Sequence, residues 1–228
     1  GTDEVVPVSS IPATVGGAVQ IYKHPIDIVA ATCLLPGSVD DLASFWQVLY
    51  AGQDCTSEVP PTRWDMDTWY SADTTVPGKS HARRAAFAHD VEMFDAGFFA
   101  IPPIEARAMD PHQRLLLQLG YQALHQAGLV TGLTPHRPED DIGVFVGLSN
   151  NEFGQLTMTE PAKAGPFTLT GTAASLAANR ISYTLGLQGP SMTVDTGTSS
   201  AHLALHLAYH SLCTDGGKAA LVAAANLL

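Results

Sequence analysis

The sequence predicts an α/β fold, in which buried strands alternate with amphipathic helices. Residues 141–149, DIGVFVGLS, form a run with apolar residues on both faces, as a central strand of a sheet requires. Residues 109–128, MDPHQRLLLQLGYQALHQAG, place apolar residues at helical spacing, with Asp110 in the first turn and Gly128 at the exit. Residues 199–217, SSAHLALHLAYHSLCTDGG, predict a second long helix that ends at two glycines.

The first third of the chain divides into four stretches. Residues 1–24 mix Pro, Ser, Gly and Val without a period and predict a linker or interdomain tether. Residues 26–36, IDIVAATCLLP, predict a buried strand that runs into a loop, and residues 40–52, DDLASFWQVLYAG, predict an amphipathic helix closed by Gly52. Residues 55–87 predict a long surface excursion that is packed by its own aromatic side chains.

The last third contains three further elements. Residues 167–187, FTLTGTAASLAANRISYTLGL, are expected to begin extended and to become helical around 173–185. Residues 191–196, SMTVDT, predict a short strand, and residues 219–228, AALVAAANLL, an apolar one. A strand this apolar requires neighbours on both sides of a sheet, and no sequence follows to supply one, so we expect an incomplete fold.

Composition limits the function classes. An apolar content of 46% allows a sizeable core. Eleven Lys and Arg stand against 22 Asp and Glu, a net charge of −11, with no basic block to follow a phosphate backbone, which argues against nucleic acid as a partner. Cys33, Cys55 and Cys213 are too far apart for a zinc or redox motif and are expected to stay reduced and partly buried, as in a cytoplasmic protein.

Neither a membrane anchor nor a nucleotide site is indicated by the sequence. No stretch approaches the roughly 18 to 20 unbroken apolar residues of a membrane span, and the opening residues lack the pattern of a signal peptide. The glycines form neither a G-x-G-x-x-G nor a P-loop pattern. We therefore expect turns and close packing to explain them.

Four segments in order resemble the ketosynthase domains of polyketide synthases and animal-type fatty acid synthases. They are DIVAATCLLPG at 27–37, SEVPPTRWDMDTWY at 57–70, FFAIPPIEARAMDPHQR at 98–114 and ANRISYTLGLQGPSMTVDT at 178–196. The resemblance runs from Ile26 to Leu228. It implies a thiolase-like fold, in which two α/β halves stack into five αβαβα layers and the whole dimerises; residues 25–228 would form the N-terminal half.

The resemblance also implies partners. The C-terminal half of the fold would come from the same gene or from a separate chain. An acyl carrier protein would present the acyl group on its phosphopantetheine, so this chain itself would hold no cofactor. The histidines that the family uses for decarboxylation would lie in the C-terminal half.

The active-site elbow of the family has the approximate sequence VDTACSSSLVALHLA, whereas residues 194–208 of this chain are VDTGTSSAHLALHLA. Thr198 thus stands where the family carries its nucleophilic cysteine. A helix N-terminus lowers the pKa of a thiol, which ordinarily lies near 8.5, but a hydroxyl needs a general base within hydrogen-bond reach. Gly197, Ala201 and His202 also depart from the family pattern, which favours a natural loss of the nucleophile over a single engineered change.

Several roles are open for the elbow residues. Thr198 or Ser199 would in the simplest interpretation cap the following helix, and capping is favoured over covalent catalysis by Thr198. Gly197 and Ser199 are candidate substrate contacts. His202, His206 and His210 recur every four residues, a spacing that can bind a metal, but a buried helix without a neighbouring carboxylate argues against a metal site.

Other conspicuous side chains have structural interpretations. The cations Arg63, Arg83, Arg84 and Arg114 are expected to hold the long loop by ion pairs, with contact to an acidic carrier protein as the alternative. Met109 and Phe145 are predicted core residues. The aromatic residues Trp64, Trp69 and Tyr70 are expected to hold the loop, or alternatively to form an interface.

Three functions are compatible with these features. The favoured one is a ketosynthase-like, non-elongating domain of a polyketide synthase assembly line, a scaffold or acyl-chain handling domain. The second is a malonyl-type decarboxylase or acyl transferase that uses histidines of the missing half. The third is a structural partner that resembles a chain-length factor.

Overall fold

The computed structural model describes residues 25–130, 141–150, 152–159, 164–214 and 216–227. The predicted tether at residues 1–24 lies outside the described residues. No helix of the described part is long and apolar enough to cross a membrane.

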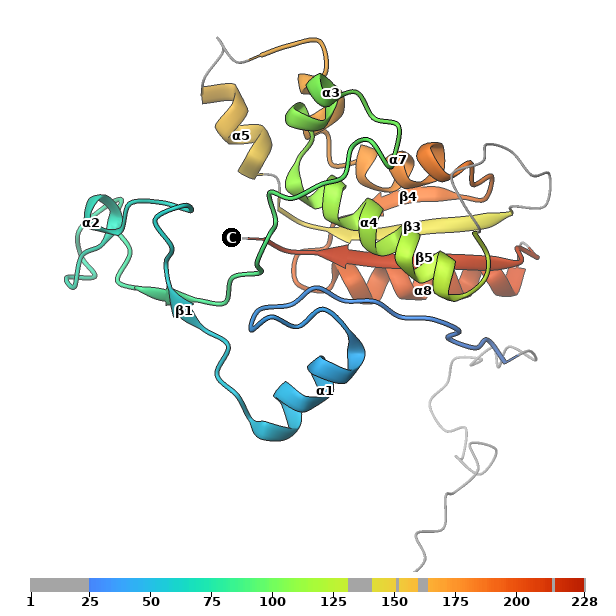
Figure 1. The fold of residues 1–228 in the computed structure, drawn as a ribbon, viewed down its shortest axis with the longest axis horizontal. Helices are drawn as coiled ribbons and strands as arrows, with labels where there is room; N and C mark the ends of the chain where they lie inside the picture. The colour runs from blue at the N-terminus through green and yellow to red at the C-terminus, as the bar shows by residue number, and fades with distance from the viewer. Residues whose placement is uncertain (1–24, 131–140, 151, 160–163, 215, 228) are drawn as a thin grey trace, which may run out of the picture.

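A three-stranded parallel sheet lies at the centre of the fold (Figure 1). Strand β3 (Ile142–Leu148) lies between β4 (Ser191–Val194) and β5 (Ala219–Ala225). Val144 pairs with Ser191 on one side and with Leu221 on the other. Every residue of β3 is buried, which confirms the prediction of a central strand from its continuous apolar run.

Helices cover both faces of this sheet. On one face lie α4 (Pro111–Gln126) and α7 (Leu176–Leu185), against Val144 and Val146. On the other face lies α8 (Ser200–Thr214), whose Ala204 and Ala208 pack on Phe145 (Figure 1). Successive β3 side chains thus enter opposite layers, as strand geometry requires.

The two long helices differ in how much they bury. Helix α4 begins at the N-cap Asp110, whose carboxylate accepts the His112 N–H at 2.8 Å, and Met109 beside it is fully buried. Helix α8 buries only Ser200, Ala204 and Ala208. The expectation that α8 is largely buried was therefore wrong: its small residues allow close packing on the sheet along one stripe and leave the rest of the helix outside the core.

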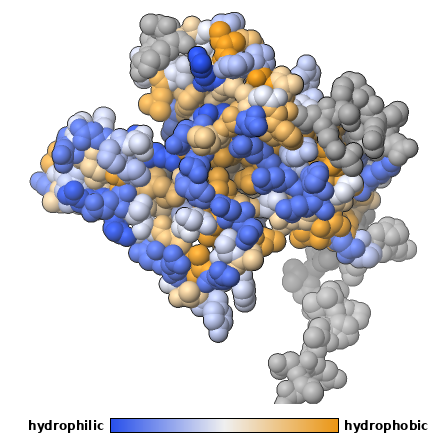
Figure 2. Space-filling view, viewed as in Figure 1, coloured by the Kyte–Doolittle hydropathy of each residue, from blue (hydrophilic) through white to orange (hydrophobic). Residues whose placement is uncertain are grey.

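The prediction of a buried strand at residues 26–36 was also wrong. This segment forms no strand within the described residues, where Leu35 makes an isolated bridge with Val39 across a turn, and Ile28 and Val29 are 84% and 70% exposed. It contacts α4 through Thr32, whose hydroxyl donates to the Leu119 carbonyl at 3.0 Å. An apolar run predicts burial only where a neighbouring strand is available to pair with it. Exposed apolar residues are not unusual in this molecule: on the face shown in Figure 2, they lie at the surface between hydrophilic residues.

Strand β5 is the sheet edge on the side away from β4. Within the described part of the chain it pairs with β3 alone, and most of its residues are only partly buried. The apolar sequence of β5 predicts a neighbouring strand on each side, and the described residues provide one of them, β3.

The long loop follows helix α1 (Leu42–Ala51), which Asp41 caps and Gly52 ends in the left-handed conformation at φ 59°. It contains α2 (Met66–Trp69) and the antiparallel pair of β1 (Ser57–Glu58) with β2 (Arg84–Ala85). Its packing by aromatic residues is confirmed for Trp64, which makes an edge contact with Phe87 at 5.7 Å between ring centroids. Trp69 is exposed.

The arginines hold this loop mainly through carbonyl groups and rings. Arg63 donates to the Ala88 carbonyl at 3.0 Å, Arg83 lies over the Tyr70 ring at 4.6 Å, and Arg114 donates to the Glu92 carbonyl at 3.2 Å. Arg84 donates to the Thr56 carbonyl at 2.7 Å and lies 4.0 Å from Asp54. Burial lowers the pKa of Arg114, opposed by the charges of Asp110 and Glu92. These contacts support the structural role and include carbonyl groups and rings beside the expected carboxylates; contact with a carrier protein stays a prediction.

The segment before α7 differs from its prediction. Residues expected to be extended form the short helix α6 (Thr168–Thr172), which lies against α3 (Pro103–Ala108). Gly171 makes this contact possible, because a Cβ there would lie 1.9 Å from the Ala108 carbonyl oxygen. Arg180 of α7 joins the same region through an ion pair with Glu105 at 2.7 Å. The remaining helix, α5, spans Glu152–Thr159.

The cysteines agree with their prediction. Cys33, Cys55 and Cys213 are free and partly buried. Burial, together with the nearby Asp41 and Asp40, raises the pKa of Cys33.

Candidate functional site

The candidate site is a pocket at the carboxyl ends of all three sheet strands. Its volume is about 600 Å³. Parallel strands bring their carboxyl ends to one edge of a sheet, where α/β proteins commonly bind ligands. The lining residues come from the end of β3, the turn between β4 and α8, and the end of β5: Gly147, Ser149, Asn150, Asp195, Gly197, Thr198, Ser200, Ala201, Ala224, Ala225 and Asn226.

A tight elbow connects β4 to α8. Gly197 has φ +65°, a conformation that favours glycine, and its N–H donates to the Asp195 carboxylate at 2.9 Å. The Ser200 hydroxyl, 5% exposed, accepts the Thr196 N–H at 2.9 Å and donates to the Gly197 carbonyl at 2.7 Å. Ser200 thereby ties the turn to the first residue of the helix.

Thr198 lies in this elbow with an exposed side chain. It lines the pocket, but its hydroxyl makes no hydrogen bond with any part of the chain that the structure describes. A threonine hydroxyl acts as a nucleophile only with a base in hydrogen-bond contact. Thr198 is thus accessible from the pocket, but no described residue is hydrogen-bonded to its hydroxyl and could act as its base.

The structure does not show the predicted capping of α8 by the hydroxyl of Thr198 or Ser199. The Ser199 hydroxyl donates back to the Thr196 carbonyl and lies at hydrogen-bond distance from the Thr196 hydroxyl, both at 3.0 Å. It therefore stabilises the turn before the helix. Ser199 is also absent from the residues that line the pocket, whereas Gly197 and Thr198 are among them.

Gly147 allows the elbow to approach β3. A Cβ at this position would lie 2.6 Å from the Ala201 nitrogen and 2.7 Å from the Ser200 carbonyl oxygen. These backbone atoms cannot move without shifting α8. Glycine at the end of β3 thus sets how closely the helix N-terminus meets the sheet.

The pocket that contains Thr198 is also lined by polar residues that were not predicted from the sequence. Asn150 and Asn226 follow β3 and β5, and their side-chain amides are hydrogen-bonded to each other. Asp195 follows β4 directly. The signal was available, because each polar residue comes directly or almost directly after an apolar strand, and parallel strands bring these positions together.

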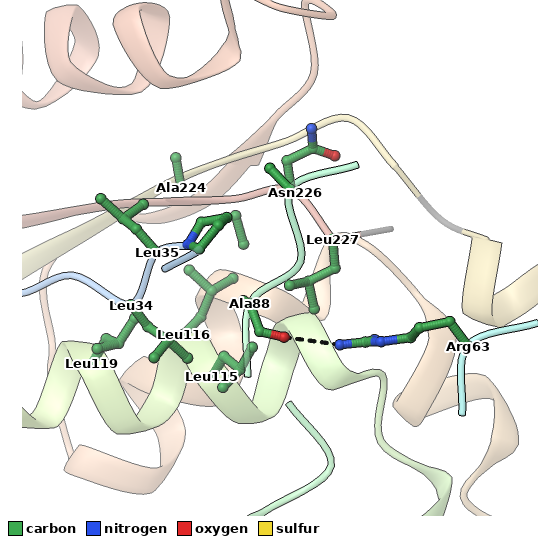
Figure 3. Close-up of a pocket in the computed structure, with 13 residues that line it drawn as sticks. Leu34, Leu35, Arg63, Ala88, Leu115, Leu116, Leu119, Ala224, Asn226 and Leu227 are labelled. Atoms are coloured by element: carbon green, nitrogen blue, oxygen red, sulfur yellow. Dashed lines mark hydrogen bonds between the residues drawn. The ribbon is translucent and has the colours of Figure 1, made fainter. Parts of the chain in front are cut away.

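A second cavity lies next to the first. Its volume is about 230 Å³, and most of its wall is apolar (Figure 3). Residues 224–226 at the end of β5 line both cavities. Arg63 lies at one end of the second cavity, where it donates to Ala88 (Figure 3).

The three histidines of α8 are exposed. Among the described residues, no three side chains of His, Cys, Asp or Glu converge as metal ligands. His202, His206 and His210 are spaced along the exposed side of the helix.

The sequence of this chain matches a known protein family. Residues 23–228 match the family model of the β-ketoacyl synthase N-terminal domain. The chain belongs to the β-ketoacyl synthase family. The resemblance found in the sequence is therefore confirmed, and the turn that contains Thr198 lies within the matched residues.

Polyketide synthases are among the relatives of this ketosynthase chain. NorC of the spectinabilin polyketide synthase system of Streptomyces orinoci is 40% identical over 232 residues, which cover 100% of this chain and 10% of NorC. A phenolphthiocerol/phthiocerol polyketide synthase protein of Mycobacterium tuberculosis is 41% identical over 194 residues, 83% of this chain and 12% of that protein. The chain thus spans about a tenth of the length of these two curated relatives.

Solved ketosynthase structures agree with the fold. The oxazolomycin ketosynthase domain of Streptomyces albus has a TM-score of 0.79 and 34% identity, covering 88% of this chain and 34% of that one. The ketosynthase of module 6 of the bacillaene synthase of Bacillus subtilis has a TM-score of 0.72 and 32% identity, covering 88% and 32%. The predicted thiolase-like α/β class, represented by its N-terminal part, is confirmed.

Proposed function

We propose that this chain is the N-terminal half of a non-elongating ketosynthase domain in a polyketide synthase, one that holds or passes an acyl chain without condensing it. The family and its polyketide synthase relatives support the first part of the proposal. The observation that carries the second part is the Thr198 hydroxyl, which stands in the pocket without a hydrogen-bonded base among the described residues.

The elbow supports this proposal on chemical grounds. The field of a helix N-terminus lowers the pKa of a thiol into a useful range, but it leaves an alcohol protonated. Claisen condensation through a thioester therefore lacks its nucleophile here. The pocket nevertheless keeps a volume of about 600 Å³ and polar groups at Asn150 and Asn226, which suits binding without covalent attachment.

The proposed partners follow from this reaction class. Residues 25–228 act with the C-terminal half of the fold, from the same or another chain, and with an acyl carrier protein whose phosphopantetheine bears the acyl group. A second copy is the further partner, for which β4 offers an unpaired sheet edge in the described structure. We further propose that residues 1–24 are a linker or interdomain tether.

A second candidate function is decarboxylation of a malonyl-type group. The polar pocket supports it, because decarboxylation needs a bound thioester and groups that stabilise the carbanion, and no nucleophile at position 198. The C-terminal half would supply the histidines. A purely structural role, like that of a chain-length factor, is the third outcome that an experiment must separate.

Intact-protein mass spectrometry distinguishes these functions. The protein that carries this sequence is incubated with acyl-loaded and with malonyl-loaded carrier protein, and its mass and the released carbon dioxide are measured. We expect no stable acyl adduct on Thr198. An adduct at Thr198 would overturn the non-covalent assignment, whereas carbon dioxide release without an adduct would select the decarboxylase.

Two matched variants show which residue carries any acyl adduct. Thr198→Ala removes the hydroxyl, and Ser199→Ala removes a neighbouring hydroxyl that bonds to Thr196 instead of facing the pocket. An adduct that survives Thr198→Ala lies elsewhere in the protein. An adduct that is lost only in Thr198→Ala would prove that Thr198 is the nucleophile.

A further inference from the structure

The end of β5 is the common wall of the two cavities. Ala224, Ala225 and Asn226 line both the elbow pocket and the apolar cavity beneath α4. A displacement of these three residues would change the pocket that contains Thr198. What holds this short segment in place therefore determines the shape of the site.

One contact holds the segment from the side of the elbow pocket. The side-chain amide of Asn150, at the end of β3, donates to the side-chain oxygen of Asn226. In Figure 3 the Asn226 side chain points away from α4, whereas that of Leu227 points toward α4. Adjacent residues of this segment thus face opposite sides, and one side is fixed by Asn150.

His112 holds the segment from the opposite side. This side chain, at the start of α4, belongs to a residue only 4% exposed. Its Nε2 lies 3.2 Å from the Leu227 nitrogen and accepts the Leu227 N–H. Leu227 directly follows Asn226, so this hydrogen bond fixes the backbone that carries the wall of the pocket.

Asp110 prepares His112 for this contact. The Asp110 carboxylate lies 2.8 Å from His112 Nδ1. A carboxylate can only accept, so the proton of a neutral imidazole is held on Nδ1 and Nε2 is left as an acceptor. A carboxylate that orients a histidine in this way is a common arrangement behind functional imidazoles.

The base of this arrangement is anchored independently of β5. The Asp110 N–H donates to the Gly171 carbonyl at 2.8 Å, and the Gln113 side chain accepts from Arg180 at 2.9 Å. His112 therefore projects from a fixed helix start.

We propose that His112 is a positioning residue of the elbow pocket: with its tautomer set by Asp110, it binds the Leu227 N–H and so fixes residues 224–226, which line this pocket together with Thr198. His112 is not among the residues that line the elbow pocket, so it acts on the pocket through the backbone at Leu227. The assignment is independent of whether the pocket binds an acyl chain, so the proposed function and this role can fail separately.

Amide hydrogen exchange tests the contact in the protein that carries this sequence. His112→Leu removes the acceptor, and His112→Gln keeps a side-chain oxygen that can accept the N–H. His125→Leu, at the exposed end of the same helix, is the control. We expect exchange of the Leu227 amide to rise on the order of fivefold to tenfold in His112→Leu, to stay near the wild-type rate in His112→Gln, and to be unchanged in the control.

Thiol labelling tests the consequence for the pocket. Thr198→Cys is introduced as a reporter, and the rate of its reaction with iodoacetamide is followed by mass spectrometry of the peptide that contains position 198. We expect His112→Leu to change this rate severalfold and His112→Gln to return it to the value of the reporter alone. An unchanged rate in His112→Leu, or equal rates in His112→Leu and His112→Gln, would overturn the positioning role.

Nitrogen NMR of the unsubstituted protein gives a test that does not depend on the folding of a variant. The proposal requires the His112 tautomer with the proton on Nδ1 and an unprotonated Nε2 at neutral pH. The opposite tautomer would overturn it, because Nε2 would then be unable to accept the Leu227 N–H.

Discussion

At the residue scale, two of the hydroxyl groups in the elbow are in different situations. The Ser200 hydroxyl is buried and makes two hydrogen bonds inside the turn, whereas the Thr198 hydroxyl stands in the pocket without a partner among the described residues. One hydroxyl therefore supports the fold, and the other is available only to whatever enters the pocket.

This difference predicts the stability of two alanine variants. Ser200→Ala leaves the Thr196 N–H and the Gly197 carbonyl without their partner, and we expect it to lower the free energy of unfolding by about 1–3 kcal/mol. Thr198→Ala is expected to change it by less than about 0.5 kcal/mol. Urea unfolding followed by circular dichroism measures both, and equal effects of the two variants would contradict the hydrogen-bond arrangement.

The ion pair of Arg180 supports a second residue-scale prediction. Its guanidinium group contacts Glu105 at 2.7 Å and Gln113 at 2.9 Å, with the Arg180 side chain only 10% exposed. A lysine cannot reach both partners with the same geometry. We expect Arg180→Lys to cost about 2–3 kcal/mol in the free energy of unfolding, because a charged hydrogen bond to a partly buried group is lost.

Arg107→Lys on the exposed end of α3 is the matched control for Arg180→Lys. It is expected to change the free energy of unfolding by less than about 0.5 kcal/mol. If both substitutions have the same small effect in urea unfolding, the Glu105–Arg180–Gln113 contacts do not stabilise this region.

At the element scale, the close approach of α8 to β3 depends on Gly147. A methyl group there would meet the Ser200 and Ala201 backbone at 2.6–2.7 Å, far inside contact distance. We expect Gly147→Ala to lower the free energy of unfolding by at least about 2 kcal/mol, since overpacking against backbone forces a shift of the helix. Thermal unfolding measures the loss.

Gly165→Ala provides the control for this substitution. A Cβ at position 165 meets nothing within 4 Å, so that variant should unfold like the unsubstituted protein. A Gly147→Ala protein as stable as the Gly165→Ala protein would show that α8 does not pack on β3 as closely as described.

The elements also show what the sequence could predict. The central strand β3 and helix α4 have strong periodic patterns and clear caps, and both were predicted. The segment at 26–36 was predicted wrongly because its apolar pattern does not say whether a strand is available to pair with it. Helix α6 was missed because its β-branched Thr residues favour extended structure, whereas contact with α3 stabilises the helix.

The candidate site, like the fold, could be predicted only in part from the sequence. The position of Thr198 followed from the resemblance of its flanking residues to a known elbow. The partnership of Asn150 with Asn226 did not, because 76 residues separate them and only the β3–β5 pairing brings them together. The His112 contact to Leu227 is longer still in sequence and depends on how α4 lies against the sheet.

At the scale of the whole molecule, acid should destabilise this chain through its hydrogen-bonded aspartates. Hydrogen bonds from Ser44, Thr56, Thr68 and Thr75 respectively lower the pKa values of Asp41, Asp54, Asp65 and Asp73. A carboxyl group whose pKa is lower in the folded state contributes stability above its unfolded pKa, and that stability is lost as the pH falls through the folded pKa.

We therefore expect stability to decline as the pH falls below about 4, the ordinary range of Asp. Urea unfolding between pH 6 and pH 3 measures this decline. The decline should be smaller in Asp41→Asn, which lacks one of these carboxylates. A profile that rises toward low pH, or one that is the same in Asp41→Asn, would contradict the assignment.

The elbow differs at several positions from the family pattern that it resembles, among them Gly197, Thr198, Ala201 and His202. Restoring the thiol by Thr198→Cys is therefore expected to give little or no condensation product on its own, which mass spectrometry of the carrier-bound products would measure.

The central claim is that this ketosynthase elbow does not elongate, and product analysis of the unsubstituted protein tests it most directly. The protein that carries this sequence is given an acyl-loaded and a malonyl-loaded carrier protein, and the carrier-bound products are identified by mass spectrometry. We predict no β-ketoacyl product above a blank without the protein. A β-ketoacyl product that forms with the unsubstituted protein and disappears in Thr198→Ala would contradict the claim.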